Sequence, residues 1–100
     1  MREVPVSAHV EGTRVLLAPD EFGPYQVRWT PGRSAASVHP NSTIADPSGD
    51  AGRRSLRDCF EIVSDGSGVE YVVERAASCQ WDEQRMTGEL VEKGRIARRG

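Results

Sequence analysis

Apolar residues recur at every second position through most of this chain. That period favours β-structure, because successive side chains of a strand point to opposite faces. The most regular stretch is DCFEIVSDGSGVEYVVER, from Asp58 to Arg75. It predicts a hairpin with a four-residue loop at 65–68 and with Ile62 opposite Tyr71. A slip of one residue would expose its apolar side chains, so the register should be firm.

The two faces of this hairpin differ in character. One face is apolar and should belong to the core, whereas the other mixes acidic and apolar side chains. The apolar face consists of Phe60, Ile62, Val69, Tyr71 and Val73, and the mixed face of Cys59, Glu61, Val63, Glu70, Val72 and Glu74. The mixed face either covers a second layer of the protein or meets a partner, and the alternation fits both.

The N-terminal half follows the same period. Alternate residues over 4–10 are apolar, and Pro5, which lacks an amide donor, predicts a strand at a sheet edge. A second hairpin is predicted between 13–17 and 25–29, because pairing Leu17 with Tyr25 brings the two apolar faces together. A short strand over 36–39, ended by Pro40, follows it.

Residues 41–57 carry the signals of a loop. Pro, Gly, Ser and Asp dominate the stretch 41–54, and Ile44 is its one large apolar residue. We therefore predict a long mobile surface loop, which in a compact domain is usually functional or disordered. Asp46, Ser48 and Asp50 match the start of a calcium-binding loop. The pattern then fails, because Ala51 and Arg57 replace the glycine and glutamate that it requires.

The stretch 79–97 admits two interpretations. Its composition favours a helix, which Ser78 or Asp82 could cap, although Gly88 disfavours it. The rival interpretation has strands that turn at 92–94 and place Leu90 opposite Ile96. We favour the helix and keep the strands as the alternative. Residues 94–100 are predicted to form a basic tail.

The sequence offers no assembled chemistry. Its soft metal ligands are His9, His39, Cys59 and Cys79, and none has the close spacing of a chelating pair. In the predicted hairpin Glu74 lies beside Cys59 and would raise the pKa of that thiol. We therefore expect no metal, no cofactor and no enzymatic activity, and we expect both cysteines to stay reduced.

Charge and localisation give weak guidance. A net charge of −2 creates no strong overall field. Twelve Arg against one Lys suggests a GC-rich genome, such as that of an actinobacterium or its phage. No apolar run approaches the ~20 residues that a membrane span needs. The first residues are too polar for a secretory signal, so we expect a cytoplasmic protein, or a virion component if it is an assembly subunit.

Eight residues are candidate partner contacts. Phe22 and Trp81 lie outside clear periodicity, and exposed aromatic residues tend to anchor interfaces. The other six form two arginine clusters that could neutralise phosphates. They are Arg53, Arg54 and Arg57 at the end of the predicted loop, and Arg95, Arg98 and Arg99 in the predicted tail.

One segment carries a local resemblance. GPYQVRWTPGRSAASVHP, at 23–40, resembles the PYxVRWxDGxxxxxxP stretch of small actinobacterial domains of unknown function with SH3-like barrels. Pro31 stands where an acidic residue is usual, and Pro40 falls one position late. The resemblance implies a twisted strand–turn–strand and nothing about activity. The matching residues are Pro24, Tyr25, Val27, Arg28, Trp29 and Gly32.

Together these patterns predict a single mainly β domain over 1–100. We expect a small antiparallel barrel or roll, SH3-like, of five or six strands, with a C-terminal helix across it, and α+β as the alternative class. We expect a non-enzymatic protein-interaction module or adaptor, with a protein partner or self-assembly and no membrane partner. The alternatives are a structural subunit of a larger assembly such as a phage virion, and a nucleic-acid-associated accessory protein that uses the arginine clusters.

Overall fold

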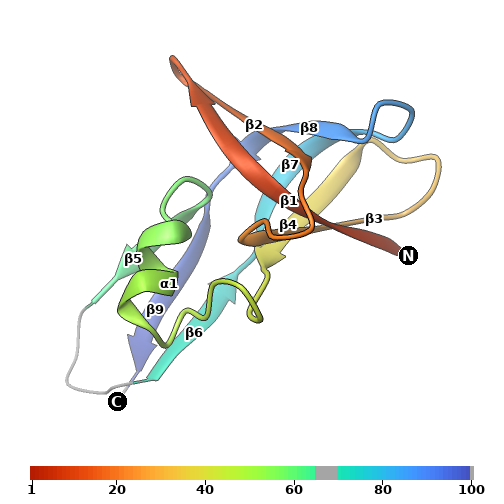
Figure 1. The fold of residues 1–100 in the computed structure, drawn as a ribbon. Coiled ribbons are helices and arrows are strands. Elements are labelled where there is room, and N and C mark those ends of the chain that lie inside the picture. The colour runs from red at the N-terminus through yellow and green to blue at the C-terminus, as the bar shows by residue number, and fades with distance from the viewer. Residues whose placement is uncertain (65–69, 100) are drawn as a thin grey trace.

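The computed structural model of the chain describes residues 1–64 and 70–99, without the side chain of Arg99. The described part is mainly β-structure and extends over 44 × 27 × 23 Å, because a small sheet projects from one end of a barrel (Figure 1). Its elements in chain order are β1 Arg2–Glu11, β2 Arg14–Pro19, β3 Tyr25–Trp29, β4 Ala35–Pro40, α1 Asp50–Ser55, β5 Phe60–Val63, β6 Glu70–Arg75, β7 Ala77–Asp82, β8 Thr87–Glu92 and β9 Gly94–Arg99.

Six strands close into an antiparallel barrel in the order β1-β2-β8-β7-β4-β3. The alternation in the sequence decides which side chains fill it. Trp29 and Trp81 pack inside, with ring centroids 5.3 Å apart. The prediction of a mainly β chain with a small antiparallel barrel is therefore confirmed. The buried residues of the barrel strands are Val6, Leu17, Tyr25, Val27, Trp29, Val38, Ala77, Cys79 and Trp81.

Strand β1 lies between β2 and β3, so two predictions for the N-terminal half are wrong. Leu17 lies opposite Ala8, and Tyr25 lies opposite Val6, instead of opposite each other. The apolar faces coincide in this arrangement too. Pro5 is tolerated away from an edge because the β1–β2 ladder begins one residue later, and the Pro5 carbonyl accepts a hydrogen bond from the Asp20 amide at 3.0 Å. The strand expected over 36–39 is present as β4.

The small sheet has the order β5-β9-β6, so the hairpin predicted over 58–75 is not formed as a two-stranded unit. Strand β9 runs between its two arms, parallel to β5 and antiparallel to β6, with Ile96 opposite both Ile62 and Val73. A two-stranded hairpin is marginal by itself, and inserting β9 buries Ile96 completely. The predicted loop at 65–68 lies outside the described residues.

The C-terminal stretch is extended, so the favoured helix over 79–97 is wrong. Strands β7 and β8 pair with each other, and β8 also pairs with β2. Leu90 lies opposite Cys79 and not opposite Ile96. Gly88 is needed because a Cβ there would lie 2.8 Å from Cε3 of Trp81. The predicted basic tail is β9, the central strand of the small sheet, which is held by the burial of Ile96.

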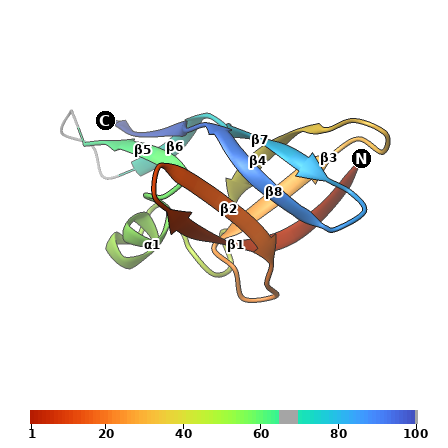
Figure 2. The ribbon, with the colours of Figure 1, turned by 90° about the horizontal axis from the view of Figure 1, so that it is seen from above.

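The segment 41–57 is more structured than the predicted loop. It contains the six-residue helix α1 and two buried apolar side chains, Ala45 and Leu56. The Leu56 amide donates to the carbonyls of Gly52 and Arg53, which ends the helix. Figure 2 shows α1 on one side of the small sheet. The segment is structured because the buried side chain of Leu56 fixes it against the core.

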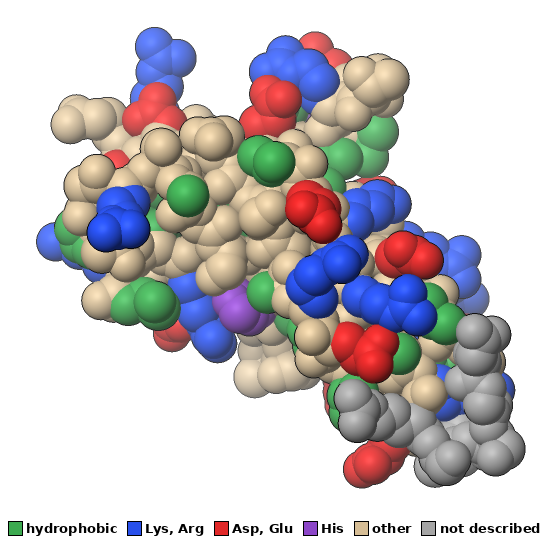
Figure 3. All heavy atoms as spheres, turned by 180° about the vertical axis from the view of Figure 1, so that it is seen from behind, with side chains coloured by type: hydrophobic (Ala, Val, Ile, Leu, Met, Phe, Trp, Pro, Cys, Tyr) green, Lys and Arg blue, Asp and Glu red, His purple; other side chains and the backbone are tan. Residues whose placement is uncertain are grey.

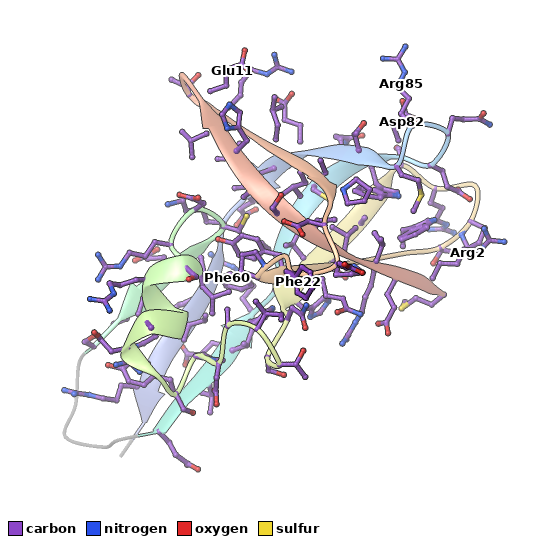
Figure 4. The ribbon with its side chains drawn as sticks, viewed as in Figure 1. Arg2, Glu11, Phe22, Phe60, Asp82 and Arg85 are labelled. Atoms are coloured by element: carbon purple, nitrogen blue, oxygen red, sulfur yellow. The ribbon has the colours of Figure 1, made fainter. Side chains whose placement is uncertain are left out.

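One continuous core joins the barrel to the small sheet. Tyr25 of the barrel stacks on Phe60 of β5, with ring centroids 6.3 Å apart. Phe60 lies where the two sheets meet (Figure 4). The only helix among the described residues is α1, which is too short and too polar to cross a bilayer.

Candidate functional site

A groove of about 670 Å3 lies on the outer face of the barrel. It crosses strands β1, β2, β8 and β7, which lie side by side in the barrel (Figure 2). The groove is lined by Ser7, His9, Arg14, Leu16, Leu17, Ala18, Gln80, Trp81, Asp82, Thr87, Gly88 and Glu89.

Strand pairing builds the centre of this groove as one row of side chains. His9 lies opposite Leu16, Leu16 opposite Glu89, and Glu89 opposite Gln80. Leu16 is half-buried and apolar, and its neighbours in the row carry hydrogen-bonding groups. The row therefore combines an apolar floor with polar groups on both sides, which is the usual composition of a ligand site.

An ion pair fixes one wall of the groove. Nη2 and Nε of Arg14 donate to Oε1 of Glu89 at 2.6 and 3.0 Å. The two residues come from β2 and β8, the pair of strands that closes the barrel. The contact orients the Glu89 carboxylate, which keeps acceptor capacity for a ligand.

The polar residues of the groove supply hydrogen-bond donors and acceptors from all four of its strands. The Ser–His contact that the structure shows lies outside the groove, on β4, where Nε2 of His39 and Oγ of Ser37 are 2.8 Å apart. Oδ1 of Asp82 accepts from the amides of Gln84 and Arg85, at 3.0 and 3.2 Å, and so shapes the turn after β7. The arrangement offers donors and acceptors at fixed positions.

Phe22 lies on the surface, as a partner contact requires. Its side chain is 70% exposed on the loop between β2 and β3 (Figure 4). The loop is braced: Oδ1 of Asp20 accepts from the Phe22 amide at 3.0 Å, and Nδ2 of Asn41 donates to the Gly23 carbonyl at 3.0 Å. Because these bonds fix the backbone of the loop, ordering it on binding costs little entropy, so Phe22 stays a candidate contact.

Trp81 does not lie on the surface, so its prediction as an exposed partner contact is wrong. Its ring is 3% exposed and packs on Trp29 inside the barrel. Ala77, Cys79 and Trp81 alternate along β7 and all point inward. The interpretation of this stretch as a helix concealed that period.

The structure brings part of the two arginine clusters together. The guanidinium of Arg53 lies 3.9 Å from the centre of the Tyr71 ring, and Arg98 is paired with Tyr71 in the β6–β9 register. Arg57 lines the same pocket as Arg53.

Arg54 and Arg95 do not line that pocket. Arg54 lies 3.4 Å from Asp50, on the surface of α1. Arg95 forms an ion pair with Glu74 at 2.9 Å, and its position in β9 alternates with that of Arg98. Arg99 ends β9, and its side chain lies outside the described part. The face of the small sheet away from α1 shows Arg and Lys interspersed with Asp and Glu (Figure 3).

Both thiols are buried within the core. Burial raises the pKa of Cys59 to about 12 and that of Cys79 to about 11. Cys59 precedes β5 and accepts through its carbonyl from the Gly94 amide at 3.0 Å, so it does not lie beside Glu74 as predicted. Within the described residues, no cluster of three His, Cys, Asp or Glu side chains is placed to hold a metal ion.

Sequence reasoning missed the groove, although one signal for it exists. In RVLLAP the apolar residues Val15, Leu16 and Leu17 interrupt the alternation, so one of them must face outward. Leu16 is that residue, and its outward position places it in the groove. The residues around Leu16 do not reveal that β8 and then β7 lie beside β2 in the barrel. Comparison with known proteins adds no assignment: no protein-family model, no curated protein and no solved structure matches this chain.

Proposed function

We propose that this chain is a non-enzymatic protein-interaction module that holds a short segment of a partner protein in the groove on the barrel. The observation that carries the proposal is the row His9–Leu16–Glu89–Gln80, where a half-buried leucine lies between polar side chains on neighbouring strands. A volume of about 670 Å3 holds a few residues of a peptide and lies within the range of ligand sites.

The closed barrel determines how such a segment binds. Each barrel strand pairs with a neighbour on both sides. None of the six strands therefore has an edge that is free along the whole strand, as β-strand addition by a partner would require. Recognition therefore depends on side chains. An apolar side chain of the partner packs on Leu16, while His9, Gln80 and the Arg14–Glu89 pair form hydrogen bonds with its polar groups.

Phe22 supplies a second anchor in this proposal. It extends from the loop that follows β2, the strand that carries Leu16. Ile44, which is also exposed, lies in a segment that Asn41 holds against this loop. A partner longer than the groove could cover both residues.

Binding of selected peptides tests the proposal. Peptides are selected from a random display library against the folded protein, and their affinities are measured by isothermal calorimetry. Leu16→Lys should weaken binding by tenfold or more, which corresponds to about 1.4 kcal/mol. The variant should fold, because a half-exposed lysine can keep its ammonium group in water.

Val91→Lys is the matched control. Val91 is an exposed apolar residue of β8 that does not line the groove, so this variant should bind like the wild type. Peptides that bind both variants equally well, or amide shifts on binding that map away from β1, β2, β7 and β8, would contradict the proposal. Phe22→Ser then measures the contribution of the loop.

The alternative functions differ in their measurable properties. A subunit of a larger assembly should form rings or large oligomers as its concentration rises, which light scattering detects. A nucleic-acid-associated protein should be retained on heparin with a steep dependence on salt. The interspersed acidic and basic side chains in Figure 3 favour the interaction module over an extended nucleic-acid surface.

A further inference from the structure

A second cavity, of about 370 Å3, lies between α1 and the small sheet. Its character differs from that of the barrel groove, because polar and charged groups dominate it. Three of its side chains are cationic, Arg53, Arg57 and Lys93, and they come from α1, from the segment after it and from the β8–β9 turn. The remaining lining residues are Asp50, Phe60, Glu61, Ile62, Ser64 and Tyr71.

The cationic groups retain donors for a ligand. The Lys93 ammonium donates one hydrogen bond, to the Arg57 carbonyl at 3.0 Å, and two N–H groups remain. The guanidinium of Arg57 has no ion-pair partner among the described residues. Nη1 of Arg53 donates to the Pro47 carbonyl at 2.9 Å, which fixes that guanidinium over the Tyr71 ring.

Two hydroxyl groups add a neutral donor. Oγ of Ser64 and the Tyr71 oxygen lie 3.2 Å apart. One of their two hydrogens forms the bond between them, so the other can point to a ligand. The hydrogen bond with Ser64, followed by the charges of Arg53 and Arg98, lowers the pKa of Tyr71, which indicates a positive local potential.

The carboxylates do not cancel this potential. Asp50 lies 3.7 Å from Arg53 and 3.4 Å from Arg54, an arginine outside the lining, so four cations of this region face the two carboxylates of the lining. Glu61 is the other carboxylate of the lining and is exposed on β5. Phe60 and Ile62 form an apolar wall that strengthens the attraction between the cations and an anion.

We propose that this pocket binds a single phosphate group, either inorganic phosphate or the phosphate of a small monoester. Two guanidinium groups, one ammonium group and one hydroxyl donor come from separate segments around the pocket, and this arrangement suits the several oxygens of a tetrahedral dianion better than the planar group of a carboxylate. The size of the pocket favours a small molecule over a polymer. This site is separate from the barrel groove, and its ligand is independent of the partner proposed there.

Titration with inorganic phosphate and with O-phosphoserine tests this site. The intact protein is titrated at constant ionic strength while amide shifts of β5, β9 and α1 are followed by NMR, with acetate as the carboxylate probe. Phosphate or phosphoserine should saturate the site and acetate should not. Tighter binding of inorganic phosphate identifies the free ion as the ligand, and tighter binding of phosphoserine identifies a monoester.

Two charge-matched variants decide between a site and general electrostatics. Arg57→Gln should weaken phosphate binding about tenfold, because it removes a bidentate donor from the pocket. Arg33→Gln removes the same charge from an exposed residue of the connection between β3 and β4, which does not line the pocket, so it should change the affinity less than about twofold. Equal effects of the two variants, or no saturable binding of either phosphate, would overturn the proposal.

Discussion

The hydroxyl group of Tyr25 joins the barrel to the segment that leads into the small sheet. It donates to the Ser55 carbonyl at 2.9 Å and accepts from the Cys59 amide at 3.2 Å. The ring is fully buried, and burial raises the pKa of this phenol, so it stays protonated and able to donate. One side chain therefore satisfies two backbone groups between α1 and β5.

Tyr25→Phe should destabilise the protein by about 1–3 kcal/mol, because the Ser55 carbonyl and the Cys59 amide lose their bonds to the hydroxyl. Urea unfolding measures the change. Tyr71→Phe is the control, since its hydroxyl contacts the exposed Ser64 and its loss should cost less than about 0.5 kcal/mol. Equal costs for the two variants would show that the Tyr25 hydrogen bonds do not hold the junction.

The buried thiols predict how stability depends on pH. Their pKa values, about 12 for Cys59 and about 11 for Cys79, lie above the ordinary 9.0, so the unfolded chain loses these protons first as pH rises. Below pH 9 both states hold the protons and stability is unaffected. Above it, the free energy of unfolding should fall by about 1.4 kcal/mol per pH unit and thiol.

Urea unfolding at pH 7 and pH 10 measures this fall. Tyr25 contributes in the same direction, since its pKa is also raised, so the wild-type slope contains more than the thiols. The quantity to compare is the change in the free energy of unfolding between pH 7 and pH 10, measured separately for each variant. Cys59→Ala should reduce that difference by about 1 kcal/mol. An unchanged pH dependence in this variant would refute the assignment to the buried thiol.

Among the elements, β9 organises the small sheet. It supplies hydrogen bonds to β5 on one side and to β6 on the other, and Ile96 at its centre is fully buried. It enters the sheet at Gly94, where an added Cβ would lie 2.5 Å from both the Arg75 carbonyl and Cε1 of Phe60. No side chain fits at this entrance.

Gly94→Ala should therefore cost about 1–3 kcal/mol through overpacking. Gly49→Ala is the control: its Cβ would lie 3.6 Å from the Asp46 carbonyl, an ordinary contact, and the cost should stay below about 1 kcal/mol. Hydrogen exchange on the Gly94→Ala variant should accelerate at β5, β6 and β9. Unchanged protection of these strands would contradict the role of Gly94 as the entrance of β9.

The predictions that are wrong concern which elements pair with each other. A two-residue period assigns each side chain to a face but does not choose the neighbouring strand. The alternation allows Ile62 to pair with Tyr71 as well as with Ile96, its observed partner. It likewise allows Leu17 to pair with Tyr25 as well as with Ala8. For that reason most of the strands, the barrel and the inward-facing residues could be predicted. The insertion of β1 and β9 between predicted hairpin arms could not, because their partners are distant in sequence.

The candidate site was less predictable than the fold for the same reason. Its strands, β1, β2, β7 and β8, come from both ends of the chain, and the composition of β7 and β8 favours a helix. Phe22 and Trp81 both lie outside clear periodicity in the sequence, but only Phe22 is exposed, because Trp81 belongs to the inward-facing residues of β7. Leu16 gave a local signal, but its neighbours Glu89 and Gln80 are defined only by the closure of the barrel.

At the scale of the whole molecule, the barrel and the small sheet share one core. The buried cluster runs without a break from the tryptophan pair through Tyr25 and Phe60 to Ile96. A shared core couples the stabilities of the two sheets, because neither can open without exposing apolar surface of the other. The chain should therefore unfold in one cooperative transition.

Ile96→Ala tests this coupling. Ile96 lies in the small sheet, whereas both tryptophans lie in the barrel, so tryptophan fluorescence reports the barrel alone. Truncating the fully buried side chain should lower the free energy of unfolding by about 2–5 kcal/mol, and in a coupled molecule the fluorescence midpoint shifts by the full amount. Far-ultraviolet circular dichroism should give the same midpoint. A fluorescence midpoint that stays at the wild-type value while the small sheet loses protection from hydrogen exchange would show two independent units, because the barrel would then be stable without its neighbour.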